Sequence, residues 1–172
     1  MRHEMRPRIM LLATPLLLAA SACANSSDIA DPAPRRTVSE KQAIAVLNHV
    51  ASRAPHLSAA QFCQELAYQK KACAYVRNQA DDFCLKPGPK PRVLRSRGIR
   101  ATKESDGGRV LEIEGKTAGG QRYVSEFFVV LPDGKPRAST AVYWSGAGLG
   151  DSPFGEKNKV LPQSECGGDA PH

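Results

Sequence analysis

Five cysteines are the residues of this chain whose type and spacing point most directly to chemistry: Cys23, Cys63, Cys73, Cys84 and Cys166. A thiol can close a disulfide in an oxidising compartment or accept a covalent lipid. Without Cys23, four cysteines remain, and an even set in an exported chain can close as two disulfides. The odd cysteine therefore needs a different fate, and the residues around it indicate which.

The stretch before Cys23 predicts a secretory signal segment. Its start is basic, with Arg2, Arg6 and Arg8, and residues 9–20, IMLLATPLLLAA, form an apolar run. This run is too short to span a bilayer as a helix, and small residues follow it, as at a signal cleavage site. We expect residues 1–22 to be a signal peptide.

The residues Ala20-Ser21-Ala22-Cys23 resemble the lipobox of bacterial lipoproteins, with Ala20 where that family usually has leucine. The resemblance implies that the Cys23 thiol receives a diacylglycerol and becomes the first residue after cleavage. Plain secretion would instead leave a free thiol there. A diacyl group plus an amide-linked chain holds a protein firmly. We therefore expect export and anchoring at the outer face of a bacterial membrane.

Composition divides the remaining chain into a tether, one domain and a tail. Residues 23–37 are small, polar and proline-bearing, which predicts a flexible, lipidated tether. Residues 38–166 suffice for a single domain with a modest core, and 167–172 should be disordered. The chain has a net charge of +7. A basic balance favours contact with anionic lipid headgroups, wall polymers or nucleic acid, or serves solubility alone.

Two helical patterns open the domain. Residues 37–40, Thr-Val-Ser-Glu, read as a capping box, and Pro55 should end the helix that follows. A second capping box at 58–61 opens a segment that runs to about residue 80. This segment is either one helix or two short helices broken near 69–71.

The disulfide pairing depends on that break. Ten residues of unbroken helix would separate Cys63 from Cys73 by about 15 Å, whereas bridged Cα atoms lie within about 7 Å. A Cys63–Cys73 bridge therefore requires a chain reversal, and otherwise each pairs with Cys84 or Cys166. We favour Cys63–Cys73 with Cys84–Cys166, but the sequence alone leaves the alternatives open.

Four strand patterns follow the proline-rich stretch 86–92, near 92–102, 109–117, 121–131 and 136–145. Short turns rich in glycine and aspartate connect them, which predicts an antiparallel meander. We therefore expect an α+β fold, with N-terminal helices packed on a curved four-stranded antiparallel sheet.

The turn lengths set the register. A two-residue turn at 133–134 places Val129 opposite Ala138 and Tyr123 opposite Trp144, and a three-residue loop at 118–120 places Leu111 opposite Phe127. The helices should cover the apolar face: Leu111, Ile113, Tyr123, Phe127, Val129, Val142 and Trp144. The other face should be solvated; it carries Glu112, Glu114, Glu126, Ser139 and Tyr143.

This order of elements, with the helical pair Cys63 and Cys73 and the strands of 109–144, resembles the nuclear-transport-factor-two-like (cystatin-related) α+β cone. It is similar to small exported lipoproteins of high-GC Gram-positive bacteria with that fold. Most of that group have no assigned activity, whereas the wider superfamily includes isomerases, hydratases, dimerisation modules and ligand-binding pockets. The fold alone therefore does not determine a function.

Candidate sites are few. Tyr123, Phe127 and Trp144 would line the cone pocket or belong to the core. The inward face lacks carboxylates and histidines, so an isomerase or hydratase would need a base from the helices, where His49, Asp81 and Asp82 lie. His49 and His56 straddle Pro55, a poor spacing for a metal pair. We expect no catalytic constellation, metal or cofactor.

Basic residues concentrate between Lys86 and Lys103, a stretch without an acid. Within it, an anion could contact Lys90, Arg92, Arg95, Arg97 and Arg100. An anchored protein could use this strip on anionic headgroups or wall polymers, at about 1 kcal/mol per basic residue. Export and few interleaved aromatics argue against nucleic acid. The glycine-rich stretch 145–150 precedes no helix and should be a flexible exit from the last strand rather than a phosphate loop.

Together these features predict a membrane-anchored, extracytoplasmic lipoprotein that binds rather than catalyses. Its partner would be an envelope protein or a small apolar ligand. An enzyme using the cone pocket and an adaptor to anionic envelope polymers are the alternatives.

Overall fold

A computed structural model describes residues 37–102, 107–155 and 159–167. It contains three helices and a four-stranded antiparallel sheet, an α+β fold as expected. The signal peptide, Cys23 and nearly all of the predicted tether lie outside the described residues, as do positions 168–172 of the tail. The elements, in chain order, are α1 (Glu40–Arg53), α2 (Ala59–Leu66), α3 (Lys70–Asp82), β1 (Arg92–Ile99), β2 (Gly108–Lys116), β3 (Arg122–Val130) and β4 (Arg137–Ala138).

The helix starts follow capping chemistry, with one correction. At α2, Ser58 and Gln61 form the predicted capping box. At α1, the box is Ser39 with Gln42, so the predicted box two residues earlier is wrong. Val38 is fully buried, and this burial fixes where the chain enters the helix. A short 3-10 turn, Ala54–His56, contains Pro55 and follows α1 directly.

The chain reverses between α2 and α3, as a Cys63–Cys73 bridge requires. The two cysteines are disulfide-bonded with Cα atoms 5.6 Å apart. The reversal at 67–69 is held by the sheet, because the Tyr68 N–H donates to the Ala138 carbonyl at 2.8 Å. The second bridge joins Cys84 to Cys166. The favoured pairing is therefore the one in the structure.

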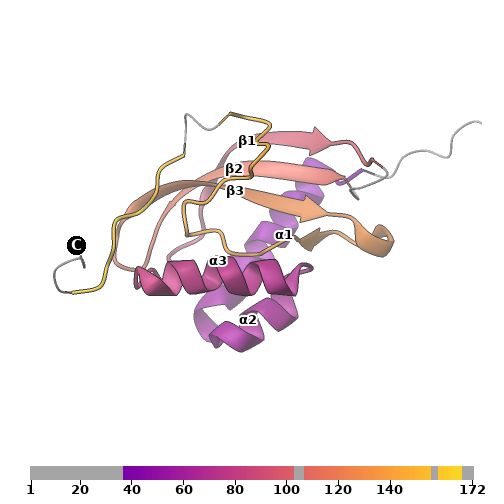
Figure 1. The fold of residues 1–172 in the computed structure, drawn as a ribbon. Coiled ribbons are helices and arrows are strands. Elements are labelled where there is room, and N and C mark those ends of the chain that lie inside the picture. The colour runs from indigo at the N-terminus through magenta and orange to yellow at the C-terminus, as the bar shows by residue number, and fades with distance from the viewer. Residues whose placement is uncertain (1–36, 103–106, 156–158, 168–172) are drawn as a thin grey trace, which may run out of the picture. The chain divides into compact units, whose positions relative to one another are not determined.

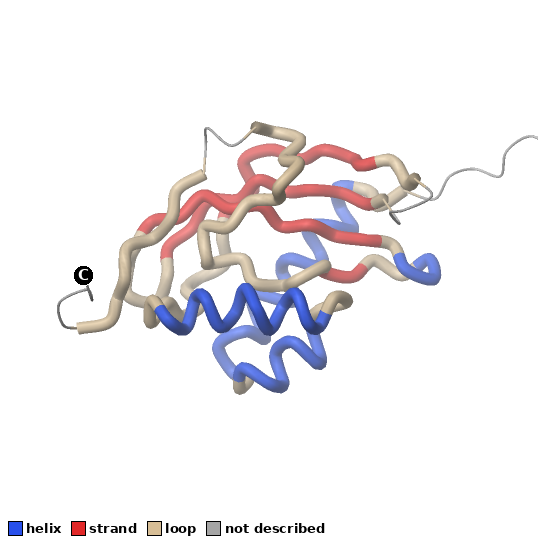
Figure 2. Tube along the Cα trace, viewed as in Figure 1, coloured by secondary structure: helices blue, strands red, loops and turns tan. Residues whose placement is uncertain are grey.

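The strands lie in the order β1-β2-β3-β4, with the predicted register between β2 and β3. Leu111 pairs with Phe127 and Ile113 with Ser125. Val129 pairs with Ala138, as the turn at 133–134 predicted. The helices lie on one side of the sheet (Figures 1 and 2), and the predicted apolar face is buried there.

The predicted fourth strand is wrong beyond Ala138. Only Arg137 and Ala138 pair with β3, so Tyr123 and Trp144 are not cross-strand partners. Ala141 has a φ of 65°, a left-handed conformation that turns the chain away from an extended path. Val142, Tyr143 and Trp144 are all buried, whereas a strand with one solvated face would bury alternate residues.

The prediction of a solvated outer face is also wrong. Glu112 is 2 % exposed, Glu126 is 7 % exposed and Tyr143 is fully buried. The C-terminal segment, residues 145–155 and 159–167, crosses β3 and β2 and reaches β1 (Figure 1). Strand periodicity says which side chains share a face, but it does not reveal an irregular segment that covers that face.

The same segment completes the edge of β3 that β4 leaves open. The Glu126 N–H donates to the Ala147 carbonyl at 3.1 Å. Val124 and Val160 exchange two backbone hydrogen bonds of 3.1 and 3.2 Å. Gly146 has a φ of 73°, and a Cβ there would lie 2.6 Å from the Val160 carbonyl. This glycine therefore permits close backbone packing, and the stretch 145–150 is held at the sheet edge rather than being a free exit.

Candidate functional site

The three aromatic residues predicted to line a pocket lie in the hydrophobic core. Tyr123 and Trp144 are fully buried and Phe127 is 2 % exposed. Trp144 makes edge contacts with Phe62 and Tyr143, at centroid distances of 5.3 and 5.0 Å. Burial raises the pKa of Tyr143 to about 12 and that of Tyr123 further. Tyr123, Phe127 and Trp144 therefore belong to the hydrophobic core rather than to the lining of a pocket.

A buried arginine completes this aromatic cluster. The Arg77 guanidinium lies 5.3 Å from the Phe62 ring centroid and 5.2 Å from that of Trp144. Its Nε donates to Asp81 at 3.2 Å. Sequence reasoning took Asp81 as a candidate base, but this carboxylate also accepts from Lys86 at 2.9 Å. Asp81 therefore holds two cations at the end of α3.

Two arginines of the predicted basic strip are neutralised within the sheet. Arg95 forms a bidentate pair with Glu112 at 2.6 and 2.7 Å. Arg92 pairs with Glu114, and Arg92 together with Arg122 lowers the pKa of that carboxyl.

The three other members of the strip form no ion pair among the described residues. Arg97 donates to the Pro153 carbonyl at 2.9 Å, whereas Lys90 and Arg100 are exposed. Most of the arginines thus bind the sheet and its covering segment.

A second charge pair lies under the C-terminal segment. Lys159 Nζ is 2.8 Å from Glu126 Oε1, and the Glu126 side chain is fully buried. Glu126 also accepts from the Leu149 N–H at 2.7 Å and from the Ser152 hydroxyl. The phenyl ring of Phe154 lies 4.7 Å below the Arg95 guanidinium. The buried Glu126 carboxylate, and Arg95 with its partner Glu112, therefore hold the C-terminal segment against the sheet.

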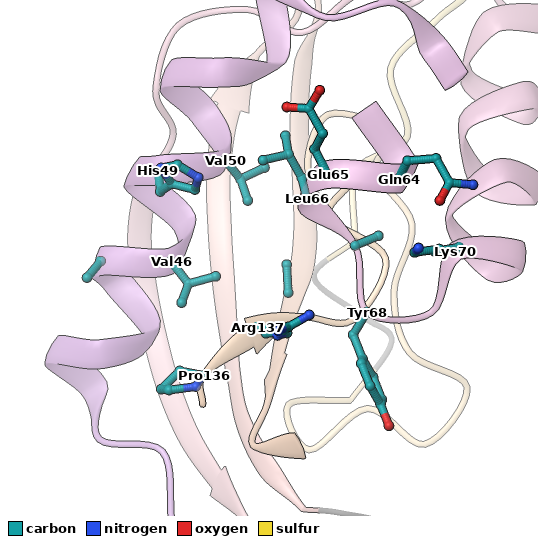
Figure 3. Close-up of a pocket in the computed structure, with 13 residues that line it drawn as sticks. Val46, His49, Val50, Gln64, Glu65, Leu66, Tyr68, Lys70, Pro136 and Arg137 are labelled. Carbon is teal, nitrogen blue, oxygen red and sulfur yellow. The ribbon is translucent and has the colours of Figure 1, made fainter. Parts of the chain in front are cut away.

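The candidate site is a groove on the helical side of the molecule, which we call the α1–β4 groove. Its volume is about 700 Å³. Residues of α1 (Ala45, Val46, His49 and Val50), residues between Gln64 and Lys70, and residues 136–138 line it. Figure 3 shows α1 on one side of the groove, the α2–α3 region on the other, and Arg137 between them.

Local structure explains how these residues meet. Val46 and Val50 lie one helical turn apart on α1, so they share a face. The Cys63–Cys73 bridge and the Tyr68–Ala138 hydrogen bond fix the reversal that carries Tyr68 and Lys70. Pairing of β4 with β3 holds Arg137 in place. The groove thus joins three stretches that are distant in sequence.

Charge in the groove is predominantly positive. Glu65 is 2.9 Å from Arg53, so its carboxylate is already paired. Among the residues that the structure describes, neither Lys70 nor Arg137 forms an ion pair. Both side chains direct nitrogen atoms into the space between the walls (Figure 3). The groove can therefore accept an anionic group beside an apolar wall.

Sequence reasoning did not find this groove, although it named His49, which lies in its α1 wall. His56 lies in the 3-10 turn outside it. Val46 and Val50 widen the apolar stripe of α1, and this was the one signal in the sequence. No sequence pattern pointed to Lys70 and Arg137, because only the folded chain brings them to the same groove.

Asp82 lines a second, smaller groove of about 400 Å³ beside the Cys84–Cys166 bridge. Two exposed apolar side chains, Phe83 and Leu161, also line it. In the described part of the chain, no cluster of histidine, cysteine and carboxylate residues could hold a metal ion. Within the same residues, no helix has the length and apolar content needed to cross a membrane.

Comparison with known proteins adds no identification: no protein-family model, curated protein or solved structure matches the chain.

Proposed function

We propose that this chain is an exported lipoprotein, anchored through Cys23, whose α1–β4 groove binds a ligand at the outer face of the membrane. The observation that carries the binding role is the groove itself, with an apolar wall and two cations that no carboxylate of the described residues neutralises. Small-molecule sites are usually concave and largely apolar, with a few convergent polar groups, and measure roughly 300–1,000 Å³. The groove matches this description in its volume and in its polar groups beside an apolar wall.

The anchor and the compartment have separate support. Two disulfides favour an oxidising compartment, because reducing systems keep cytosolic thiols free. They consume four cysteines and leave Cys23 for lipidation, next to an apolar run that precedes it. The location proposed here therefore rests on cysteine chemistry, and the binding role rests on the groove.

The alternatives have less support. The groove contains His49 and Glu65, but the Glu65 carboxylate is paired with Arg53. An isomerase or hydratase remains a prediction without a positioned base. An adaptor to anionic polymers would use the basic strip Lys90, Arg92, Arg95, Arg97 and Arg100. Two of its members, Arg92 and Arg95, already bind Glu114 and Glu112 of the same sheet.

Mass spectrometry of the processed protein, purified from its native membrane, tests the anchor. We expect an acylated Cys23 as the first residue and partition into the detergent phase, with Cys23→Ser moving to the aqueous phase. An unmodified Cys23 thiol would refute the lipoprotein proposal.

A neutral hydrophobic dye, N-phenyl-1-naphthylamine, tests the groove in the full chain carrying Cys23→Ser. We expect one saturable site, blocked by Ala45→Phe, because this exposed alanine lines the groove. Ala74→Phe is the matched control, since Ala74 is an exposed alanine of α3 outside the groove. Equal dye binding by both variants would place the dye elsewhere and remove the support for the groove.

A further inference from the structure

The α1–β4 groove brings to one cavity two cations that have no ion pair within the described part of the chain. Carboxylates neutralise many of the other arginines: Arg53 by Glu65, Arg77 by Asp81, Arg95 by Glu112, and Arg92 and Arg122 by Glu114. Among the described residues, Lys70 and Arg137 have no such partner. Both line the same groove, so an anionic group bound there can attract either cation. Lys90 and Arg100 are also exposed, but they lie outside the groove.

Apolar side chains form the floor and one wall of the groove. Val50 is 1 % exposed and Leu66 is 8 % exposed, so they form a packed floor with almost no free surface. The accessible apolar surface comes from the exposed Ala45 and the half-buried Val46 and Pro136. A ligand that fills the groove would therefore bury an alkyl chain against this surface and present its anion to Lys70 and Arg137.

An added peptide strand fits this groove poorly. The edge of β4 is occupied by the α2–α3 reversal, because Tyr68 N–H donates to the Ala138 carbonyl and Gln69 N–H to the Ser139 carbonyl. Recognition by strand addition needs a free edge, whose backbone groups supply the affinity. The occupied edge leaves side-chain contacts as the means of recognition.

From these observations we infer that the ligand of the groove is a single-chain amphiphile with a carboxylate head group, such as a long-chain fatty acid. This inference rests on the proposed binding role. The Arg137 guanidinium presents a planar fork that matches a carboxylate, and the Lys70 ammonium adds a second charge. The alkyl chain would lie against Ala45, Val46 and Pro136, the apolar lining residues with accessible surface.

Displacement of N-phenyl-1-naphthylamine from the full chain carrying Cys23→Ser tests the inference, with dodecanoate, dodecanol and dodecyltrimethylammonium as competitors. Charged hydrogen bonds at a partly exposed site should make dodecanoate bind about tenfold more tightly than dodecanol. The cationic competitor should bind more weakly than dodecanol. Hexanoate should bind at least about tenfold more weakly than dodecanoate, because it buries fewer methylene groups.

The variant Lys70→Gln/Arg137→Gln should bind dodecanoate no more tightly than dodecanol, with dodecanol affinity unchanged. Lys90→Gln/Arg100→Gln is the control, because it removes the same charge from exposed residues outside the groove. Equal affinities for dodecanoate and dodecanol in the parent chain would overturn the inference, as would a preference that survives in Lys70→Gln/Arg137→Gln.

Two further outcomes separate this inference from the proposed function. Dye binding without any preference for the anion overturns the amphiphilic carboxylate and leaves the groove as a binding site. A chain that binds no dye overturns both. A short acidic peptide without an alkyl chain that competes as well as dodecanoate also overturns the inference, in favour of a protein partner.

Discussion

Removal of each disulfide should destabilise the domain to an extent set by the length of the loop that the bridge closes. Cys84 and Cys166 are separated by 82 residues, and Cys63 and Cys73 by 10. Loop-closure entropy gives about 4.5 kcal/mol for the longer loop and about 2.7 kcal/mol for the shorter one. Cys84→Ala/Cys166→Ala should therefore cost about 2 kcal/mol more than Cys63→Ala/Cys73→Ala.

Guanidinium chloride unfolding measures this difference, with fluorescence of Trp144 as the signal, since it is the one tryptophan in the chain and is fully buried. The full chain carrying Cys23→Ser is the reference for both variants. If the short-loop variant loses as much stability as the long-loop variant, loop entropy does not govern the bridges. A long-loop variant as stable as the reference would mean that noncovalent contacts alone hold the C-terminal segment.

Three other perturbations address the buried charges and the tyrosines. Lys159→Ala leaves the buried Glu126 carboxylate without its cation and should cost about 3 kcal/mol in denaturant unfolding; a loss below 1 kcal/mol would contradict this. The raised pKa of Tyr143, about 12 against an ordinary 10.0, means that the folded chain keeps this proton while the unfolded chain loses it. Stability should therefore be full below pH 10 and fall towards pH 12, and Tyr143→Phe should reduce the fall, leaving the contribution of Tyr123. Arginine partners lower the pKa of Glu114, so its contribution is present at neutral pH and is lost as the pH falls through its folded-state pKa; Glu114→Gln should flatten thermal stability across that acid range.

The parts of the fold that the sequence predicted depend on local rules. Alternating apolar residues and the turn at 133–134 were enough to pair Val129 with Ala138. The three-residue length of the loop at 118–120, after β2, was enough to pair Leu111 with Phe127. A capping box gave the start of α2, and the spacing of Cys63 and Cys73 made their bridge conditional on a chain reversal, which the sequence left open and the structure contains.

The failures depend on contacts between distant stretches. Glu112 and Glu126 alternate with apolar residues as a solvated face would, yet the C-terminal segment covers them. The residues 139–144 favour a strand, but the edge of β3 is paired instead by Ala147 and Val160. The α1–β4 groove was missed for the same reason, because no local pattern relates Lys70 to Arg137.

The covering segment also sets the order in which the molecule can be completed. β1 to β3 precede residues 145–167 in the chain, so a carboxylate row and an open strand edge face water until that segment has docked. An uncovered edge is a template for pairing with other chains. A chain truncated near residue 145 would lack Val160 and Cys166, and it should therefore aggregate more readily than the full chain.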